Sequence, residues 1–261
     1  MIVEPIKTRA LLPPSDDLFD ALFCALPKKI PERSILAVTS KVVSISEGRC
    51  VADDGSVSKR ELAEREADLY IKPEDSPLGR RFNTITKGIL IGSAGIDASN
   101  GDGYFILWPV DPERSASRIR LWLTKTYGLS DIGVLITDSH TMPLRRGAVG
   151  LALASAGFEP LRDYRGTPDI FGRAFKAEQA NLADGLAAAA VVAMGEGSEC
   201  TPAALVSDIP RIVFRNAPSR SGRKFSSLVV PLAEDVFASF LGKAPWQRGR
   251  KLLRKKERAL V

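Results

Sequence analysis

The chain has 261 residues, of which 44% are hydrophobic and 26% charged, the composition of a globular protein with a sizeable core. The N-terminal segment lacks a basic stretch followed by an apolar one. The longest apolar run, residues 186–194, is far shorter than the roughly 20 residues that span a bilayer. Three widely spaced cysteines without a CxxC pair argue against a disulfide framework or a zinc site. These features predict a cytoplasmic protein with no membrane partner.

The formal net charge of +6 is concentrated at the C-terminal end. From Lys243 onward the chain carries eight basic residues against one acid, Glu257, so the remainder is nearly neutral. We expect residues 243–261 to be a solvated extension, because chain ends are commonly unstructured. The alternative is a salt-sensitive attachment to nucleic acid or anionic lipid. Since no aromatic residues are interleaved with basic ones in the body, we expect no nucleic-acid partner.

The predicted elements alternate between strands and helices. Residues 34–45 are rich in β-branched side chains and predict a strand that leads into a polar turn. Residues 88–92 and 104–107 are two further short strand candidates. Asp111 then supplies a helix N-cap before a proline, and apolar residues at helical spacing continue to Gly128, which ends the helix.

Strands and helices also alternate further along the chain. Residues 132–137 form a continuous apolar run, typical of a strand covered on both faces, which stops at Asp138. Residues 147–156 predict another strand or an alanine-rich buried segment. Residues 179–194 carry one apolar helical stripe, with Gly195 as its C-terminal cap. The mixture predicts an α/β or α+β fold and leaves the topology open.

Four polar clusters interrupt the apolar pattern, and the first is AGIDASN at residues 94–100. Asp97 lies among small residues just past a predicted strand. Such a carboxylate suits a hard metal ion, because small neighbours let phosphate oxygens approach. The alternative is an Asx turn, in which Asp97 and Asn100 bond nearby backbone groups.

The second cluster is Asp138, Ser139 and His140, directly after the apolar run. Catalytic groups of α/β folds commonly lie at the carboxyl ends of strands. The alternative is a helix N-cap formed by Asp138 or Ser139. His140 is the one histidine in the chain, which excludes a zinc site built from several histidines. It is a candidate for a general base or for a simple hydrogen-bond partner.

The third and fourth clusters carry paired arginines and paired glycines. Arg145 and Arg146, soon followed by Arg162, Arg165 and Arg173, predict fork-like binding of phosphate or carboxylate. The alternative is surface ion pairs with Asp163, Asp169 and Glu178. MGEGSECT at residues 194–201 predicts a loop whose amides face phosphate oxygens, although a helix stop alone explains its first glycine. With Glu196 added to the two aspartates, the four clusters suit Mg²⁺ or Mn²⁺ and a phosphorylated substrate.

The order of these clusters and their residue sequences resemble those of the coenzyme F420-0:γ-glutamyl ligase family. The match is colinear over residues 6–207, and AGIDASN followed at a distance by TDS and MGEGSE is a specific combination. The remaining matching stretches are VTSKVVS (38–44), EGR (47–49), DPERSASRIR (111–120), VLIT (134–137), PLRRGAVGLAL (143–153), GFEPLRDYRG (157–166) and DIFGR (169–173).

The resemblance implies a GTP-dependent ligase that attaches L-glutamate to a carboxylate acceptor, coenzyme F420-0, through an acyl phosphate. It also implies a two-domain α/β fold over residues 1–242, which leaves residues 243–261 as a basic tail. Two such chains would form an intertwined homodimer, with the nucleotide and two divalent ions, Mg²⁺ or Mn²⁺, in a groove at its interface.

The same resemblance assigns site residues by position. Asp97 and Asp138 would hold one metal ion, and Ser139 and Glu196 the second. Asp138, His140, Arg145 and Arg146 are the catalytic candidates, with the two arginines clamping an anionic substrate. The nucleotide would contact Arg9, Ala10, Leu11, Leu12, Ser40, Lys41, Asn100, Met194, Gly195, Glu196, Gly197, Ser198, Glu199, Cys200 and Thr201.

Two departures from the family pattern bear on the acceptor. Ile45 stands where the family has a lysine near the nucleotide, and Ser139-His140-Thr141 replaces the usual threonine-x-glycine. Loss of a cation that faces phosphate changes how a nucleotide is bound. The alternatives are therefore a γ-glutamate ligase for a folate-like or other acceptor, and a nucleotide-binding homologue without activity.

Overall fold

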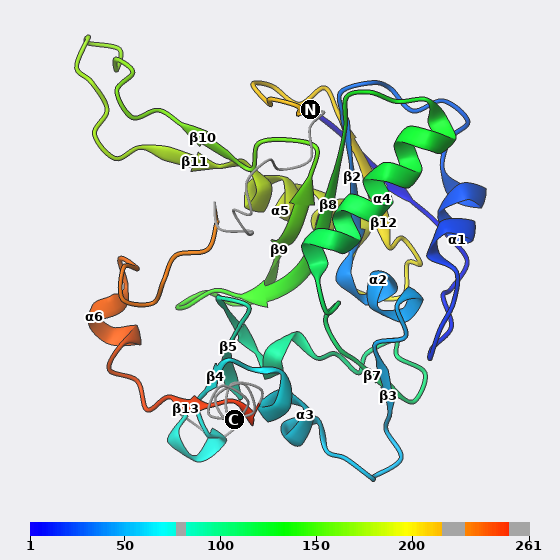
Figure 1. Ribbon diagram of the computed structural model, residues 1–261, viewed down its shortest axis with the longest axis vertical. Coiled ribbons are helices and arrows are strands. Elements are labelled where there is room, and N and C mark those ends of the chain that lie inside the picture. The colour runs from blue at the N-terminus through cyan, green and yellow to red at the C-terminus, as the bar shows by residue number, and fades with distance from the viewer. Residues whose placement is uncertain (77–81, 216–227, 251–261) are drawn as a thin grey trace, which may run out of the picture.

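A computed structural model describes residues 1–76, 82–215 and 228–250 and is built around a five-stranded sheet (Figure 1). β2 and β8 pair in parallel, and the other neighbours pair antiparallel. The chain is therefore a mixed α/β protein, as predicted. In sheet order the strands are β1 (Ile2–Ile6), β12 (Ala203–Ser207), β2 (Ser34–Thr39), β8 (Ile132–Thr141) and β9 (Ala148–Ala156).

Helices cover both faces of this sheet, which explains the unbroken apolar runs in its central strands. On β2, Leu36 and Val38 pack into one core cluster, while Ile35 and Ala37 pack into another. The first cluster is shared with α1 (Leu18–Ala25), α2 (Ser40–Ser46) and α4 (Pro112–Tyr127), and the second with α5 (Leu182–Met194).

A second group of elements has its own small core, which includes Leu62, Phe82 and Phe105. Its four-stranded sheet has the order β13, β4, β5, β6, and β3 pairs with β7 beside it. The bounds are β3 (Cys50–Ala52), α3 (Lys59–Glu66), β4 (Leu69–Tyr70), the 3₁₀ helix η1 (Pro73–Asp75), β5 (Asn83–Thr86), β6 (Ile89–Gly92), the 3₁₀ helix η3 (Ser93–Gly95), β7 (Tyr104–Ile106) and β13 (Gln247–Arg248).

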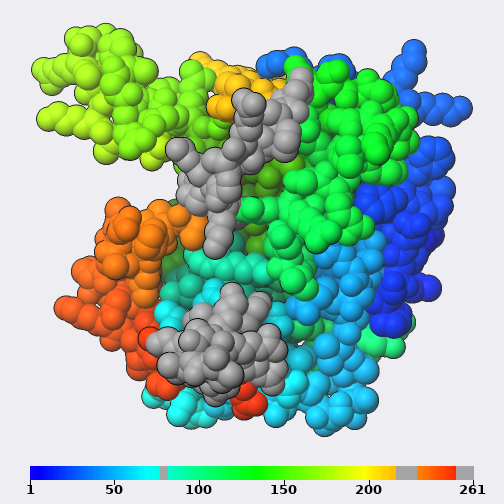
Figure 2. All heavy atoms as spheres, in the orientation of Figure 1, coloured from blue at the N-terminus to red at the C-terminus, as the bar shows by residue number. Residues whose placement is uncertain are grey.

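An arm built on β10 (Leu161–Asp163) and β11 (Gln179–Asn181) projects away from the sheet. Figure 2 shows its tip standing clear of the body, above the segment that contains α6 (Ala238–Leu241). None of the helices in the described part of the chain has both the length and the apolar character needed to cross a bilayer.

Several predicted elements are confirmed and three are wrong. Asp111 caps α4 by accepting from the Arg114 amide, and Gly128 ends that helix with a φ of 68°. Residues 34–45, however, form a strand only to Thr39 and then α2, because burial of its apolar side chains in the core outweighs the low helix propensity of β-branched residues. Residues 179–181 belong to β11, so the helix begins later than expected.

The third error concerns the end of β8, which continues past Asp138 to Thr141 instead of stopping there. Antiparallel pairing with β9 satisfies its backbone over this polar stretch, with a register shift between Ile136 and Thr137. Neither Asp138 nor Ser139 caps a helix. Their side chains instead project from a strand.

Residues 243–250 are mostly exposed to solvent, as expected of the extension, but the expectation that they are unstructured is wrong. β13 pairs with β4 in that segment, and the Trp246 indole donates to the Leu241 carbonyl at 2.7 Å. Arg250 lies 3.4 Å from Glu64 of α3. Residues 251–261 lie outside the described part of the chain.

Candidate active site

A cavity of about 610 Å³ lies at one edge of the central sheet. β1, β2 and β8 all run toward this edge, because β1 and β2 both pair antiparallel with β12 and β2 pairs parallel with β8. Crevices at the carboxyl ends of strands are the common ligand sites of α/β sheets. The lining residues are 8–13, Thr39, Lys41, Val42, Ile45, Asn100, Asp102, 137–139, Val191 and 194–202.

Asp138 lines this cavity and is half-buried. It accepts hydrogen bonds from the Trp108 indole and, at 2.8 Å, from the Ser139 amide. Burial raises the pKa of Asp138 to about 6, and the negative charge of Asp97 raises it as well. The hydrogen bonds from Trp108 and Ser139 and the positive charge of Lys41 act on this pKa in the opposite direction.

Trp108 can reach Asp138 because Gly95 leaves room for its ring. Gly95 has a φ of +73°, and a Cβ atom there would lie 2.1 Å from the Trp108 ring. The glycine of AGIDASN thus serves two purposes, a left-handed backbone and close packing against an indole. Both set the position of Asp97 two residues later.

Asp97 is held by a lysine and by its own turn. Lys41 Nζ lies 2.9 Å from Asp97 Oδ2, and the Ser99 amide donates to Asp97 Oδ1 at 2.8 Å. Burial alone would raise the pKa of Asp97, but the hydrogen bond and charge of Lys41 hold it below its ordinary value. The alternative of an Asx turn is therefore confirmed for Asp97 but wrong for Asn100, whose side chain bonds the distant Gly197.

Two hydrogen bonds join the polar clusters across the cavity. Ser139 Oγ donates to Glu196 Oε1 at 2.6 Å, which ties β8 to the loop after α5. Asn100 Nδ2 donates to the Gly197 carbonyl at 2.9 Å, which ties the AGIDASN turn to the same loop. Three stretches far apart in sequence thus meet at one site.

The loop after α5 is folded back on itself. Gly195 ends the helix with a φ of 80°, and its amide still donates to the Val191 carbonyl. The Glu199 carboxylate accepts from the Gly197 amide at 2.8 Å. A Cβ atom on Gly195 would lie 2.6 Å from Glu199, so the glycine lets this carboxylate come close. Gly195 therefore ends the helix and also permits the folding of the polar loop that follows.

The comparisons with known proteins decide the family. The model of the F420-0:Gamma-glutamyl ligase family matches residues 6–208. The chain belongs to the F420-0:gamma-glutamyl ligase family. It is thereby an enzyme of the class of ligases that form carbon–nitrogen bonds.

Several curated relatives carry the name coenzyme F420:L-glutamate ligase. The relative from Methanopyrus kandleri is 32% identical, with 90% of this chain and 96% of that protein covered. A relative from Methanococcus maripaludis is 31% identical, with 91% and 100% covered. A third, from Methanocaldococcus jannaschii, is 32% identical, with 80% and 86% covered. The similarity therefore extends over most of each chain.

The oxygen ligands expected for this ligase family occur as two pairs. Asp97 lies close enough to Asp138 to raise its pKa, and Ser139 is bonded to Glu196. Over residues 1–76, 82–215 and 228–250, no three acidic, histidine or cysteine side chains surround one ion position. Carboxylate and hydroxyl donors suit Mg²⁺ or Mn²⁺.

The residues assigned to the nucleotide mostly line the cavity. Residues 9–12, Lys41, Asn100 and 194–201 are all among its lining residues. Ser40 is not, and it is buried at the start of α2. Asp97 is not a lining residue either, but it forms an ion pair with Lys41, which lines the cavity.

The other catalytic candidates lie outside the cavity. His140 is half-buried on β8, where burial lowers its pKa. Arg145 and Arg146 are exposed in the turn between β8 and β9, and neither has an acidic partner among the described residues. The surface ion pair expected as an alternative does form elsewhere, between Arg165 and Asp163 at 2.6 Å.

Sequence reasoning missed several residues of the site. Trp108 bonds the central aspartate, and Asp102 lines the cavity. Trp108 carried no local signal, since one tryptophan at the end of an apolar strand resembles a core residue. Asp16 was also missed, because it lies directly beside a helix N-cap. Its carboxylate bonds Arg9 and the Leu12 amide, at the two ends of a stretch that lines the cavity.

Proposed function

We propose that this chain uses GTP and two divalent ions to join L-glutamate to the carboxylate of coenzyme F420-0. The names of its relatives support the substrates, and the meeting of three polar clusters at one cavity supports a nucleotide and metal site there. That meeting is the observation that carries the proposal. Three free cysteines, in the described part, suit the cytoplasm, where we place the reaction.

The chemistry has to activate a carboxylate before an amide can form. In our proposal, an oxygen of the acceptor carboxylate attacks the γ-phosphorus of GTP, and the bond to the β-phosphate oxygen breaks. GDP leaves, and the acceptor carries an acyl phosphate. The glutamate amine then attacks the acyl carbon, the carbon–oxygen bond to phosphate breaks, and inorganic phosphate leaves while a base takes the amine proton.

The chain's residues divide this work by position. Asp97 with Asp138, and Ser139 with Glu196, would hold divalent ions, which supply neutralising charge beside the phosphates. Lys41 adds a fixed positive charge at the same side, 2.9 Å from Asp97. Backbone amides of the loop after Met194 would bind phosphate oxygens. His140 and the pair Arg145 and Arg146 remain candidates for the base and for the clamp on an anionic substrate.

Ile45 favours a second candidate, in which the ligase acts on another carboxylate acceptor. Its side chain is 2% exposed and lines the cavity, where the family resemblance placed a lysine. An apolar side chain at that position removes a contact to an anionic group and offers one to an apolar group. A folate-like acid is the acceptor class to compare with coenzyme F420-0.

The proposal also includes a homodimer of two-domain chains, in which the arm of β10 and β11 reaches the partner. The support is the arm's shape, which leaves Ile170 92% exposed and Phe171 81% exposed at its tip. Large apolar side chains that are exposed together commonly mark a surface that binds another protein.

Replacement of one metal carboxylate tests the enzymatic proposal. We expect Asp138→Asn to abolish glutamate transfer, because a neutral amide binds a divalent ion weakly while keeping the shape of the side chain. The measurement is mass spectrometry of the acceptor after incubation with GTP, Mg²⁺ and glutamate, run in parallel with coenzyme F420-0 and a folate-like acid.

Asp208→Asn is the matched control, since Asp208 is 82% exposed and pairs only with the chain's N-terminus at 3.6 Å among the described contacts. It should retain full activity. If Asp138→Asn transferred glutamate at the wild-type rate, the metal assignment would be wrong. If the wild-type chain modified neither acceptor, the ligase proposal in this form would fail.

A further inference from the structure

One wall of the cavity is built from residues 9–13, which belong to no helix or strand. On one side the Thr8 amide donates to the Cys200 carbonyl at 2.9 Å, and Leu11 is anchored in the core with 8% exposure. An irregular backbone has no hydrogen-bond ladder of its own, so side chains must fix its shape.

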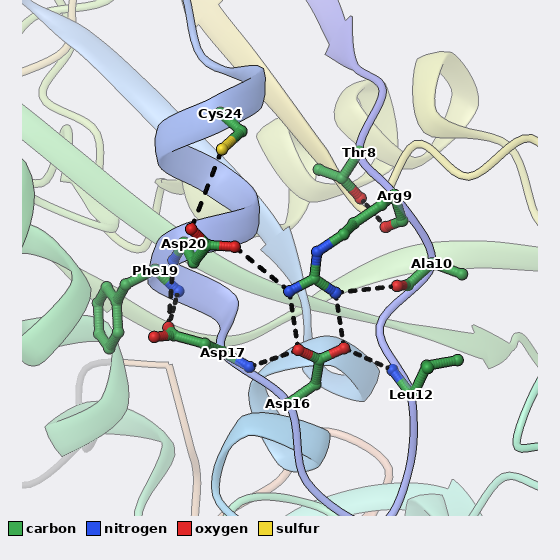
Figure 3. Close-up of polar contacts among 9 residues, drawn as sticks. All are labelled: Thr8, Arg9, Ala10, Leu12, Asp16, Asp17, Phe19, Asp20 and Cys24. Carbon is green, nitrogen blue, oxygen red and sulfur yellow. Dashed lines mark hydrogen bonds and ion pairs between the residues drawn. The ribbon is translucent and has the colours of Figure 1, made fainter.

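Asp16 supplies that fixation (Figure 3). Its carboxylate accepts from Arg9 Nη1 at 2.6 Å and from Arg9 Nη2 at 2.8 Å, the two-pronged geometry of a guanidinium–carboxylate pair. It also accepts from the Leu12 amide and the Asp17 amide, at 2.8 and 2.7 Å. One side chain thus holds both ends of the wall.

The neighbouring Asp17 has a separate task. It caps α1 by accepting from the amides of Phe19 and Asp20 at 2.8 and 3.1 Å. The two adjacent aspartates therefore face different ways, one toward the helix and one toward the cavity wall (Figure 3). Each can be replaced without removing the contacts of the other.

The Arg9 guanidinium is bonded to carboxylates, so in this arrangement it is not available to bind a phosphate group. Its guanidinium also lies 3.4 Å from Asp20 and donates to the Ala10 carbonyl at 3.1 Å. The hydrogen bond from Arg9 lowers the pKa of Asp16, so the pair stays charged at neutral pH. The Asp16 side chain is 15% exposed, which protects its contacts from water.

We propose that Asp16 is a positioning residue of the nucleotide site, which fixes the wall at residues 9–12 by gripping the Arg9 guanidinium and the Leu12 amide. This inference rests on the proposed function. Asp16 does not touch the metal carboxylates or the loop after α5, so its loss should loosen the wall and leave the reacting groups in place. Nucleotide affinity should then fall while the catalytic rate holds.

The experiment compares four variants for binding of a non-hydrolysable GTP analogue and for KM and kcat with GTP. For Asp16→Ala we expect Kd and KM to rise roughly tenfold, with kcat within about twofold of wild type, because several hydrogen bonds to a charged group are lost. Arg9→Ala should give a smaller rise, since the Leu12 amide keeps its acceptor. Asp16→Asn retains that acceptor and should recover part of the affinity. Asp17→Asn, an equally good cap, should match wild type.

Circular dichroism shows whether each variant folds, and Asp16→Asn carries the test if Asp16→Ala does not. Equal nucleotide affinity in the folded Asp16 variants and the wild type would overturn the inference. A fall in kcat at unchanged KM would also overturn it, because that pattern belongs to a catalytic group. Failure of the wild-type chain to bind the analogue would instead overturn the proposed function.

Discussion

At the scale of single residues, the site depends on contacts that need glycine or a buried polar group. Asp138 accepts a hydrogen bond from the Trp108 indole, and that indole packs on Gly95. The sequence pattern selected Asp138 and Asp97 as candidates, because carboxylates at the ends of apolar runs stand out, and the family resemblance assigned them to a metal ion. It could not identify Trp108, because its role depends on a contact 30 residues away in the chain.

Gly95→Ala tests this packing. The new Cβ atom would meet the Trp108 ring, and the φ of +73° adds backbone strain. We expect a loss of at least about 2 kcal/mol in the free energy of unfolding, measured by urea denaturation. Gly48→Ala is the matched control, because Gly48 has a φ of +65° and no atom within 4 Å of the added Cβ. It should lose about 1 kcal/mol. Equal losses would mean that the indole does not constrain Gly95.

At the scale of elements, the position of α5 against β9 sets the loop that carries Glu196. A Cβ atom on Gly150 would lie 2.4 Å from the Ala187 carbonyl oxygen, so β9 and α5 approach closely there. Periodicity predicted α4 and its cap well, because its apolar stripe and capping residues are local signals. It failed for residues 40–46 and for the end of β8, where tertiary burial and strand pairing decide the structure.

Gly150→Ala should push α5 away from the sheet. We expect a loss of about 1–3 kcal/mol in the free energy of unfolding and weaker nucleotide binding, since the Ser139–Glu196 hydrogen bond would stretch. Gly185→Ala, in α5 with open space around its Cβ position, is the control. It should gain about 0.5–1 kcal/mol from helix propensity alone. A neutral effect of Gly150→Ala on both readouts would contradict the close packing.

At the scale of the whole molecule, packing within a single chain does not explain the projecting arm of β10 and β11. Its tip is ordered by Asp169, whose carboxylate accepts from the amides of Phe171 and Arg173 at 2.8 Å each. The turn therefore presents Ile170 and Phe171 in a fixed conformation, as binding surfaces commonly do. The family resemblance predicted a homodimer, but no local pattern in residues 161–181 indicated that they form an arm.

Phe171→Asp should weaken the proposed homodimer. Burial of a carboxylate without a partner at an interface is costly, so we expect monomers at concentrations where the wild type is dimeric. Light scattering after size exclusion measures this, with Phe237→Asp as a control, since Phe237 is 54% exposed but lies beside α6 rather than on the arm. A wild-type chain that stays monomeric at high concentration would rule out the homodimer.

The proposed reaction requires carboxylates from distant segments to hold divalent ions beside a triphosphate. Electron paramagnetic resonance of Mn²⁺ with a non-hydrolysable GTP analogue measures this directly. We expect the wild type to bind two coupled Mn²⁺ ions per chain and Asp138→Asn to lose at least one of them and the coupling. Identical Mn²⁺ binding in the two proteins would contradict the account.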